Sequence, residues 1–315
     1  MSPVLMMNGI HPVKAAAAGG LRLSGRELGS DVLPIPGQEL IDAMRSQRER
    51  LKIISGERIR DELLKIIEAP YPSAGLDLAV ATDLAEEFLP ELPALRLEQD
   101  PIHRHKDVLA HTVAVVAKTS PRLTLRLAAL LHDVGKPKTR GFGPQGVTFH
   151  HHEVVGARMA RERLVALRYP NEIVDAVTKL VELHLRFHTY RMGWTDSAVR
   201  RYVRDAGPLL DDLNELTRSD CTTRNAKKAA ALARRMDELD ARIEVLAAQE
   251  ELAKIKPPLD GDEIMAFLGV PPGPLVGEAR AFLLELRLDE GPIGKDEAFR
   301  RLDAWAREHG IEPAR

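Results

Sequence analysis

Histidine is distributed unevenly along this 315-residue chain. Nine of the eleven histidines fall between His103 and His188, an interval that covers little more than a quarter of the sequence. Within it, His132 is followed directly by Asp133. Imidazoles and carboxylates that lie close together in sequence are the donor groups with which proteins bind divalent transition metals. The clustering therefore predicts a metal site in this interval.

Helical periodicity indicates which elements would bring these side chains together. Helices are expected over residues 107–118, 122–134, 171–188 and 208–224, each with an apolar stripe. A metal-competent residue continues each stripe, and these residues are His111, His132, His184 and Asp220. Burial of an imidazole or a carboxylate without a partner costs several kcal/mol. One bound cation would account for all four positions together.

Each residue taken alone also has a less specific explanation. A single histidine on an apolar face, such as His188, is more often a hydrogen-bonded core residue. A single buried carboxylate such as Asp220 is most often a hydrogen-bond acceptor. Of the three histidines at 150–152, one is expected to face the site. The adjacent pair His132 and Asp133, in LLHDVGK, is the most specific feature.

The composition favours a helical globular protein. Apolar residues make up 44% of the chain and charged residues 29%, which is sufficient for a buried core and excludes general disorder. Aromatic residues make up only 4%, which argues against a β-sandwich or a barrel. The sequence shows no confident strand pattern and no internal repeat, and Gly141–Gly146 is expected to form a surface loop. We therefore expect an all-α fold.

Two features bear on location. A single cysteine, Cys221, excludes a disulfide framework within the chain. The first residues do not have the pattern of a signal peptide, and no run approaches the roughly 18 apolar residues of a membrane span. The sequence therefore predicts a cytoplasmic protein with no membrane partner.

Charge is concentrated in the middle of the chain. Residues 101–225 carry 20 Lys+Arg and 13 Asp+Glu, a net charge of +7. The segments before and after it carry −5 and −4. A basic region between acidic flanks suits a polyanionic substrate, although a solvated helix face also explains an individual arginine.

Several motifs, taken in order, carry a resemblance to a known family. They are SGERIRDELLKII (55–67), HRHKDVLAHT (103–112), LAALLHDVGKP (127–137), FHHHEVVGA (149–157), LVELHLRFH (180–188), LTRSDCTTRN (216–225) and PPLDGDEIMAFLGVPPGPLVG (257–277). This series resembles the bacterial, HD-bearing members of the CCA-adding tRNA nucleotidyltransferase and poly(A) polymerase family. The resemblance covers about residues 38–290.

The resemblance implies a metal centre of the HD phosphohydrolase type. Its ligands would be His111, His132, Asp133 and Asp220, and its ion would be Mn, Ni, Co, Fe or Mg. A second ion would involve His152 and His184, but Leu185 stands where some family members have Asp, which favours one ion. The resemblance assigns the catalytic roles to Asp133 and Lys136.

The same resemblance divides the chain into four regions. They are an irregular lead (1–37), neck-like RNA-binding helices (38–100), an HD metal-binding domain (101–225) and a helical body and tail (226–315). The expected fold is thus an all-α arrangement of a multi-helix neck, an HD-type domain and a helical tail.

The N-terminal head that carries nucleotide addition in the family is not recognised. Gly19-Gly20-Leu21-Arg22 only partly matches its Gly-Gly-x-Val-Arg-Asp turn. The Asp-x-Asp sequence at 260–262 follows two prolines and is better explained as the N-cap of a helix. Nucleotide addition by this chain alone is therefore not expected.

Three functions remain open from the sequence. In the first, the chain docks tRNA during 3′-end maturation and also contains a metal-dependent phosphohydrolase. The RNA contacts would come from five arginines: Arg158, Arg161, Arg200, Arg201 and Arg204. The alternatives are a stand-alone HD phosphohydrolase and a non-catalytic tRNA-binding fragment. A long charged helix expected over 226–252 could pair two copies in a homodimer.

Overall fold

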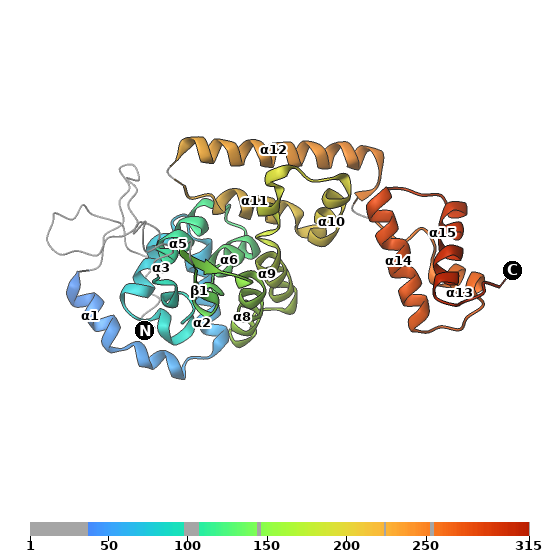
Figure 1. Ribbon diagram of the computed structural model, residues 1–315. Coiled ribbons are helices and arrows are strands. Elements are labelled where there is room, and N and C mark those ends of the chain that lie inside the picture. Colours follow the sequence, from blue (N-terminus) through green and yellow to red (C-terminus); the bar gives the residue numbers. More distant parts are fainter. Residues whose placement is uncertain (1–36, 98–106, 144–145, 224, 253–254, 315) are drawn as a thin grey trace. The chain divides into compact units, whose positions relative to one another are not determined.

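The computed structural model describes residues 37–97, 107–143, 146–223, 225–252 and 255–314 (Figure 1). Helices dominate these residues, and the strands among them form one two-stranded sheet, which confirms the expected all-α fold. Contacts divide the chain into two compact units. Unit 1 comprises Met1–Phe187 and Asp211–Leu232, and unit 2 comprises His188–Leu210 and Ala233–Arg315. The four regions expected from the sequence stay predictions.

Unit 1 begins with short helices whose apolar faces are buried. They are α1 (Gln38–Ser46), the 3-10 turn η2 (Arg48–Ile53), α2 (Gly56–Glu68), α3 (Pro72–Ala81), α4 (Ala85–Phe88) and η3 (Pro93–Leu95). Helix α2 buries Leu63, Ile66 and Ile67, as its spacing predicts. At its end, the buried Arg126 donates to the carbonyl oxygens of Ile67 (2.5 Å) and Ala69 (2.8 Å). These two hydrogen bonds join the N-terminal helices to the centre of unit 1.

Four longer helices form the centre of unit 1. They are α5 (Val108–Lys118), α6 (Leu123–Leu131), α8 (His152–Ala166) and α9 (Asn171–Leu183). Helix α9 packs against both α6 and α8, and α5 packs against α6. Helix α11 (Leu210–Asp220) follows later in the chain, and its residues from Asp211 onward belong to the same unit. Leu125, Leu130, Val177 and Leu180 are almost fully buried between these helices.

A small hairpin interrupts the helices between α6 and α8. After the short α7 (Lys136–Thr139), β1 (Arg140–Gly143) pairs antiparallel with β2 (Gly146–Phe149). The expectation of an irregular loop over Gly141–Gly146, with no strand, was wrong at this point. Strands of four residues are too short for the alternation of side chains to stand out in a sequence.

Three of the expected helices end earlier than predicted. Helix α11 ends at Asp220 rather than at residue 224. Helix α6 ends at Leu131 rather than at residue 134, and α9 ends at Leu183 rather than at residue 188. For α6 and α9 the next residue is a histidine, His132 or His184. The stripe therefore does not extend to His188, which lies beyond the end of α9 and is exposed.

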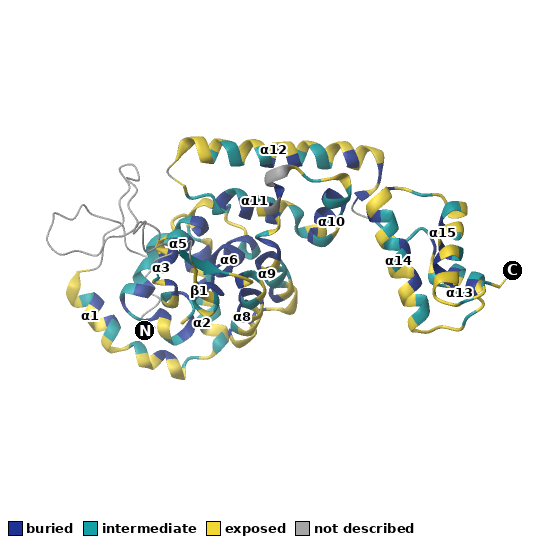
Figure 2. Ribbon diagram, viewed as in Figure 1, coloured by how far each residue is buried: buried dark blue, intermediate teal, exposed yellow. Residues whose placement is uncertain are grey.

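Unit 2 contains α10 (Asp196–Ala206), most of α12 (Ala226–Gln249), and the C-terminal helices α13 (Gly261–Leu268), α14 (Pro274–Glu290) and α15 (Lys295–Glu308). Its apolar core includes Ile264, Leu283, Leu302 and Trp305. Figure 2 shows that α12 is exposed along much of its length, whereas Met236, Leu239 and Leu246 are buried. The expected pairing of this helix in a homodimer stays a prediction.

Helix α13 begins with a capping box. The Asp260 carboxylate accepts a hydrogen bond from the backbone N–H of Glu263 (2.9 Å), and the Glu263 carboxylate accepts one from the backbone N–H of Asp260 (2.9 Å). This arrangement confirms that Asp260 is a helix N-cap. None of the helices within the described residues is long and apolar enough to cross a membrane.

Candidate metal centre

The four predicted ligands meet in unit 1. Nε2 of His111 lies 2.9 Å from Oδ1 of Asp220, and Nε2 of His132 lies 3.2 Å from Oδ2 of Asp133. The two Nε2 atoms are 3.4 Å apart. Helices α5 and α11 and the turn after α6 bring these side chains together. His111, His132 and Asp133 thus offer three ligand atoms within 4.8 Å of one another.

A second group of possible ligands shares Asp133. His152 and His184 each offer a ligand atom within 4.8 Å of that carboxylate and of one another. Nε2 of His152 lies 3.4 Å from Oδ1 of Asp133, whereas Oδ2 of the same residue faces His111 and His132. Of the three histidines at 150–152, His152 is buried at the site and the other two are exposed. The two carboxylate oxygens therefore face different imidazole groups.

Local hydrogen bonds fix the orientation of the imidazoles. Three rings use Nδ1 to donate to the carbonyl oxygen three residues earlier, at 2.6–2.8 Å: His132 to Ala129, His152 to Phe149 and His184 to Val181. A carbonyl oxygen can only accept, so Nδ1 carries the proton and, in the neutral ring, Nε2 carries the lone pair. His111 is held in a similar way by the Thr222 hydroxyl, 2.8 Å from its Nδ1. In their neutral forms, His132, His152 and His184 thus direct an acceptor nitrogen, Nε2, inward.

This acceptor-rich cluster suits a cation. Among the described residues, Nε2 of His152 and Nε2 of His184 are buried and have no hydrogen-bond partner. Asp133 is 1% exposed, so its charge is also removed from water. Buried acceptors without donors are unfavourable unless a cation is coordinated. A set of imidazole and carboxylate ligands, with Nδ1 of each ring held by a second group, is typical of transition-metal sites.

The charges of the cluster affect its protonation. Burial alone would raise the pKa of Asp133, but His132, His152 and Lys136 together hold that pKa well below its usual range. Burial and the neighbouring His132 lower the pKa of His184 to about 3. For His132, burial lowers the pKa, and the carboxylates of Asp133 and Asp220 outweigh that effect and raise it. Asp133 is therefore ionised and His184 neutral near pH 7, which are the forms that bind metals.

Lys136 lies inside the cluster rather than at its edge. Its ammonium group is 2.6 Å from Oδ2 of Asp133, and the residue is only 6% exposed. It also lies over the ring of Phe149, 5.7 Å from the ring centroid. The predicted catalytic lysine is thus close enough to affect a phosphate held near Asp133.

Gly135 allows the turn that carries His132 and Asp133 to approach α8. A Cβ atom at this position would lie 2.2 Å from the carbonyl oxygen of His152 and 2.8 Å from the backbone nitrogen of Gly156. Only glycine can occupy such a position without displacing the backbone. No role for Gly135 was expected from the sequence, although its position between Asp133 and Lys136 in HDVGK was a signal.

The loop after α11 was also not anticipated. Lys118 donates to the carbonyl oxygens of Ser219 (3.4 Å) and Cys221 at the end of that helix. These bonds hold the segment from which Asp220 and Thr222 reach His111. No periodic pattern in the sequence marks these contacts.

The predicted RNA-binding arginines lie in both units. Arg158 and Arg161 are exposed on α8 of unit 1, where Arg161 forms an ion pair with Asp175. Arg204 is exposed on α10 of unit 2. On the same helix, Arg201 forms ion pairs with two acidic residues of α14.

Arg200 differs from the other four. It is 7% exposed, and its guanidinium contacts the Glu250 carboxylate at 2.8 Å. It also donates to the carbonyl oxygen of Leu288 at 3.2 Å. These groups occupy the guanidinium donors of Arg200 inside unit 2. We therefore assign Arg200 a structural role in place of the expected contact with RNA.

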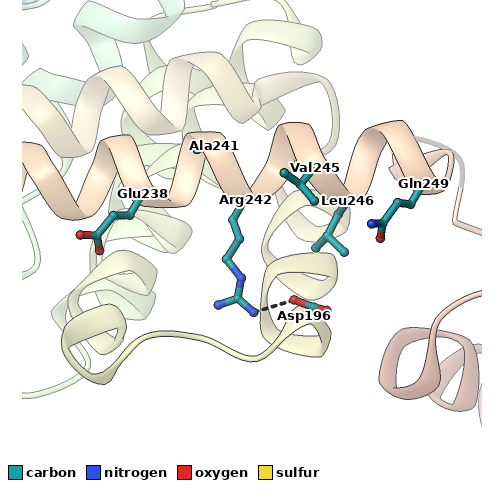
Figure 3. A pocket seen from close by; sticks show the side chains of 7 residues that line it. All are labelled: Asp196, Glu238, Ala241, Arg242, Val245, Leu246 and Gln249. Carbon is teal, nitrogen blue, oxygen red and sulfur yellow. Dashed lines mark hydrogen bonds and ion pairs between the residues drawn. The ribbon is translucent and has the colours of Figure 1, made fainter.

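A pocket elsewhere in unit 2 lacks the features of the metal cluster (Figure 3). It has a volume of about 420 Å³ and is lined by residues of α12 and by Asp196 at the start of α10. Its arginine, Arg242, forms an ion pair with Asp196 at 2.5 Å. Its lining includes no histidine. The imidazole and carboxylate donors expected from the sequence therefore lie in the cluster around Asp133 and not in this pocket.

Sequence comparisons relate the chain to known proteins. Two family models match the chain: "Probable RNA and SrmB- binding site of polymerase A" over residues 37–95 and "HD domain" over residues 108–243. The chain is 38% identical over 263 residues to the CC-adding tRNA nucleotidyltransferase of Thermus thermophilus, which is 79% of this chain and 56% of that protein. The chain is thus similar to the CCA-adding tRNA nucleotidyltransferase and poly(A) polymerase family over most of its length. The resemblance of its motifs is thereby confirmed.

A second similar protein is the A-adding tRNA nucleotidyltransferase of Deinococcus radiodurans. It is 36% identical over 269 residues, which is 82% of this chain and 60% of the relative. The chain thus spans a little over half the length of these two relatives. The HD model covers His111, His132, Asp133 and Asp220, and the RNA-binding model covers the N-terminal helices of unit 1.

Proposed function

We propose that this chain provides the RNA-binding and HD parts of a tRNA 3′-end processing enzyme and that its HD centre is a metal-dependent phosphohydrolase. The observation that carries this proposal is the cluster around Asp133. Four imidazole Nε2 atoms and two carboxylates converge there, and two of the nitrogens are buried without a hydrogen-bond partner among the described residues. A divalent cation matches this donor set.

The ion would be held by His111, His132, Asp133 and Asp220, and a second ion would use His152 and His184. The ion, one of Mn, Ni, Co, Fe or Mg, would polarise a phosphoryl oxygen and make a bound water more acidic. The chain itself supplies rigid positioning, because backbone carbonyls hold three of the imidazoles.

Lys136 has a separate role in this proposal. Its ammonium group lies beside Asp133 in a buried environment, where a positive charge interacts strongly with a phosphate. We propose that it stabilises the negative charge that develops on the phosphoryl group during hydrolysis. Asp133 and Lys136 are thus the catalytic pair, one as a ligand and the other as a charge partner of the substrate.

The substrate class follows from the RNA-binding region and the family. We propose that the substrates are 2′,3′-cyclic phosphates or phosphate monoesters at an RNA end, with tRNA as the partner. The exposed arginines Arg158, Arg161 and Arg204 would contact its phosphates. Contacts of this type position an RNA without reading its sequence.

The test is to follow opening of a 2′,3′-cyclic phosphate at the end of a tRNA with Mn²⁺ or Ni²⁺ present. We expect metal-dependent opening that Asp133→Asn abolishes. Asp260→Asn is the matched control, because that carboxylate caps a helix in unit 2. Absence of opening by the unmodified chain, with tRNA still bound, would reject the hydrolase and support a non-catalytic docking role.

A further inference from the structure

The hairpin between α7 and α8 carries a row of alternating cations and aromatic rings. Lys136 lies over the ring of Phe149, 5.7 Å from its centroid. Phe149 is paired with Arg140 across the two strands. The Arg140 guanidinium in turn lies 5.2 Å from the centroid of the Phe142 ring. We call these four residues the hairpin row.

The strand geometry places the row on one face of the hairpin. Directly opposed residues of an antiparallel pair point to the same side, so Phe149 and Arg140 share a face. Residues two apart in a strand also share a face, which adds Phe142. The contact between Arg140 and Phe142 agrees with this arrangement.

The row leads from the metal cluster to solvent. At its inner end, Lys136 is 2.6 Å from Asp133 and almost fully buried. Phe149 is half-buried and Arg140 is exposed. At the outer end, Phe142 is 77% exposed, which is unusual for a phenylalanine. Because its ring contributes little to the core of unit 1, packing does not explain its identity.

We propose that the hairpin row binds the last nucleotides of a single-stranded RNA end and directs the terminal phosphate into the HD centre. A base would stack on Phe142, and phosphates would lie against Arg140 and Lys136. Proteins that hold single strands combine cations along the backbone with aromatic rings under the bases. The inference rests on the proposed function, because it takes the HD centre as the destination of the phosphate.

Charge complementarity favours RNA over an apolar partner. An isolated exposed ring would also suit contact with another protein, whereas the hairpin row alternates rings with two positive charges. The row would favour the ends of single strands, because a base in a duplex has both faces covered by its neighbours. Every base has an aromatic face, so the row would hold an RNA end without strong sequence preference.

The test uses a single-stranded RNA with 2-aminopurine as its last base, because stacking on an aromatic ring quenches the fluorescence of that base. We expect quenching on binding to the unmodified chain, both in EDTA and in Mn²⁺. Phe142→Ala should remove the quenching and weaken binding about five- to a hundredfold. Phe142→Trp should retain both, because it keeps an aromatic face.

Val245→Ala is the matched control. Val245 is 56% exposed on α12 and lies outside both the hairpin row and the segment that matches the RNA-binding family model. Its loss should leave quenching and RNA affinity unchanged, and both alanine variants should unfold at the temperature of the unmodified chain. Quenching that is absent from the unmodified chain, or that persists in Phe142→Ala, would overturn the inference.

A turnover assay separates this inference from the proposed function. Phe142→Ala should lower kcat/KM for an RNA that ends in a 2′,3′-cyclic phosphate by a similar factor. It should leave kcat/KM for bis(p-nitrophenyl) phosphate unchanged, because that substrate is too small to use the row. Suppose that Phe142→Ala loses the quenching but neither the unmodified chain nor the variant shows turnover. This result would reject the hydrolase and support the hairpin row as a site for RNA ends. Turnover on RNA that is unchanged in Phe142→Ala would retain the hydrolase and reject the row.

Discussion

Each of the two units buries a cluster of charged residues, and the two clusters are composed differently. In unit 1, four imidazoles lie beside the carboxylates of Asp133 and Asp220, and Lys136 is the cation next to Asp133. In unit 2, a single carboxylate, Glu250, lies between two arginines. The first cluster has more acceptors than donors, and the second has more donors than acceptors.

This difference separates a site from a structural element. In unit 2 the carboxylate of Glu250 contacts Arg200 at 2.8 Å and Arg287 at 2.5 Å, and Arg200 also reaches backbone carbonyls near the end of α14. The chain supplies every charge that this cluster needs. In unit 1 the inward nitrogens of His152 and His184 find no donor among the described residues. A buried cluster with an excess of acceptors is thus a better indication of a ligand than burial of charge by itself.

The largest effect is expected from breaking the unit 2 cluster. Glu250→Gln would leave Arg200 and Arg287 buried without a counter-charge, and this should lower the free energy of unfolding of unit 2 by about 3–5 kcal/mol. Both tryptophans, Trp194 and Trp305, lie in unit 2, so urea denaturation followed by tryptophan fluorescence measures this. The exposed Glu244→Gln on α12 is the control and should change little. A change below 1 kcal/mol would mean that the ion pairs are not a structural element.

The next effect concerns metal removal from unit 1. Asp133→Asn should weaken Mn²⁺ or Ni²⁺ binding at least about a hundredfold, because it removes the carboxylate that faces both groups of imidazoles. The unmodified chain should lose about 5–10 °C in the melting temperature of unit 1 when EDTA removes the metal. Calorimetric titration and hydrogen exchange of α6 and α9 measure these changes. Equal metal affinity in Asp133→Asn and in the unmodified chain would refute the assignment of Asp133 as a ligand.

A smaller effect is expected at Gly135, where the turn before α7 closely approaches α8. Gly135→Ala should lower the stability of unit 1 by about 1–3 kcal/mol, because the added Cβ would collide with the backbone of α8. It should also weaken metal binding, since His152 would move away from Asp133. Hydrogen exchange of α8 and calorimetry are the measurements. Gly277→Ala on the exposed side of α14 meets no atom within 4 Å and should stabilise unit 2 by about 0.5–1 kcal/mol.

The smallest effect separates a helix cap from a metal ligand. Asp260→Ala should lower the stability of unit 2 by about 0.5–2 kcal/mol, because it removes one half of the capping box. Asp262→Ala in the first turn of α13 should have a smaller effect. Metal affinity should be the same in both variants and in the unmodified chain. Reduced metal binding by Asp260→Ala would contradict the assignment of this Asp-x-Asp sequence to a cap.

Much of the helical fold could be predicted, and part of the site. The spacing of apolar residues placed α5 close to its observed bounds, because a helix must bury one face and so repeats that face in sequence. The same periodicity placed His111, His132, His184 and Asp220 toward the interior. It failed at the ends of α6, α9 and α11. At the ends of α6 and α9 the histidine ring binds the carbonyl three residues earlier, and the helix does not continue.

The sequence by itself determined that the chain is helical, that its histidines and aspartates face inward in one region, and that Asp260 caps a helix. These properties depend on local periodicity and on hydrogen bonds within a few residues. Only the tertiary structure decided which buried charges form a site. Arg200 and Lys136 are both basic residues in basic segments, yet one is paired with Glu250 and the other lies beside Asp133. Glu250 is 50 residues from Arg200 in sequence, and only packing brings the two side chains together. Asp133 is three residues from Lys136, but it faces the imidazoles only because other helices pack around it.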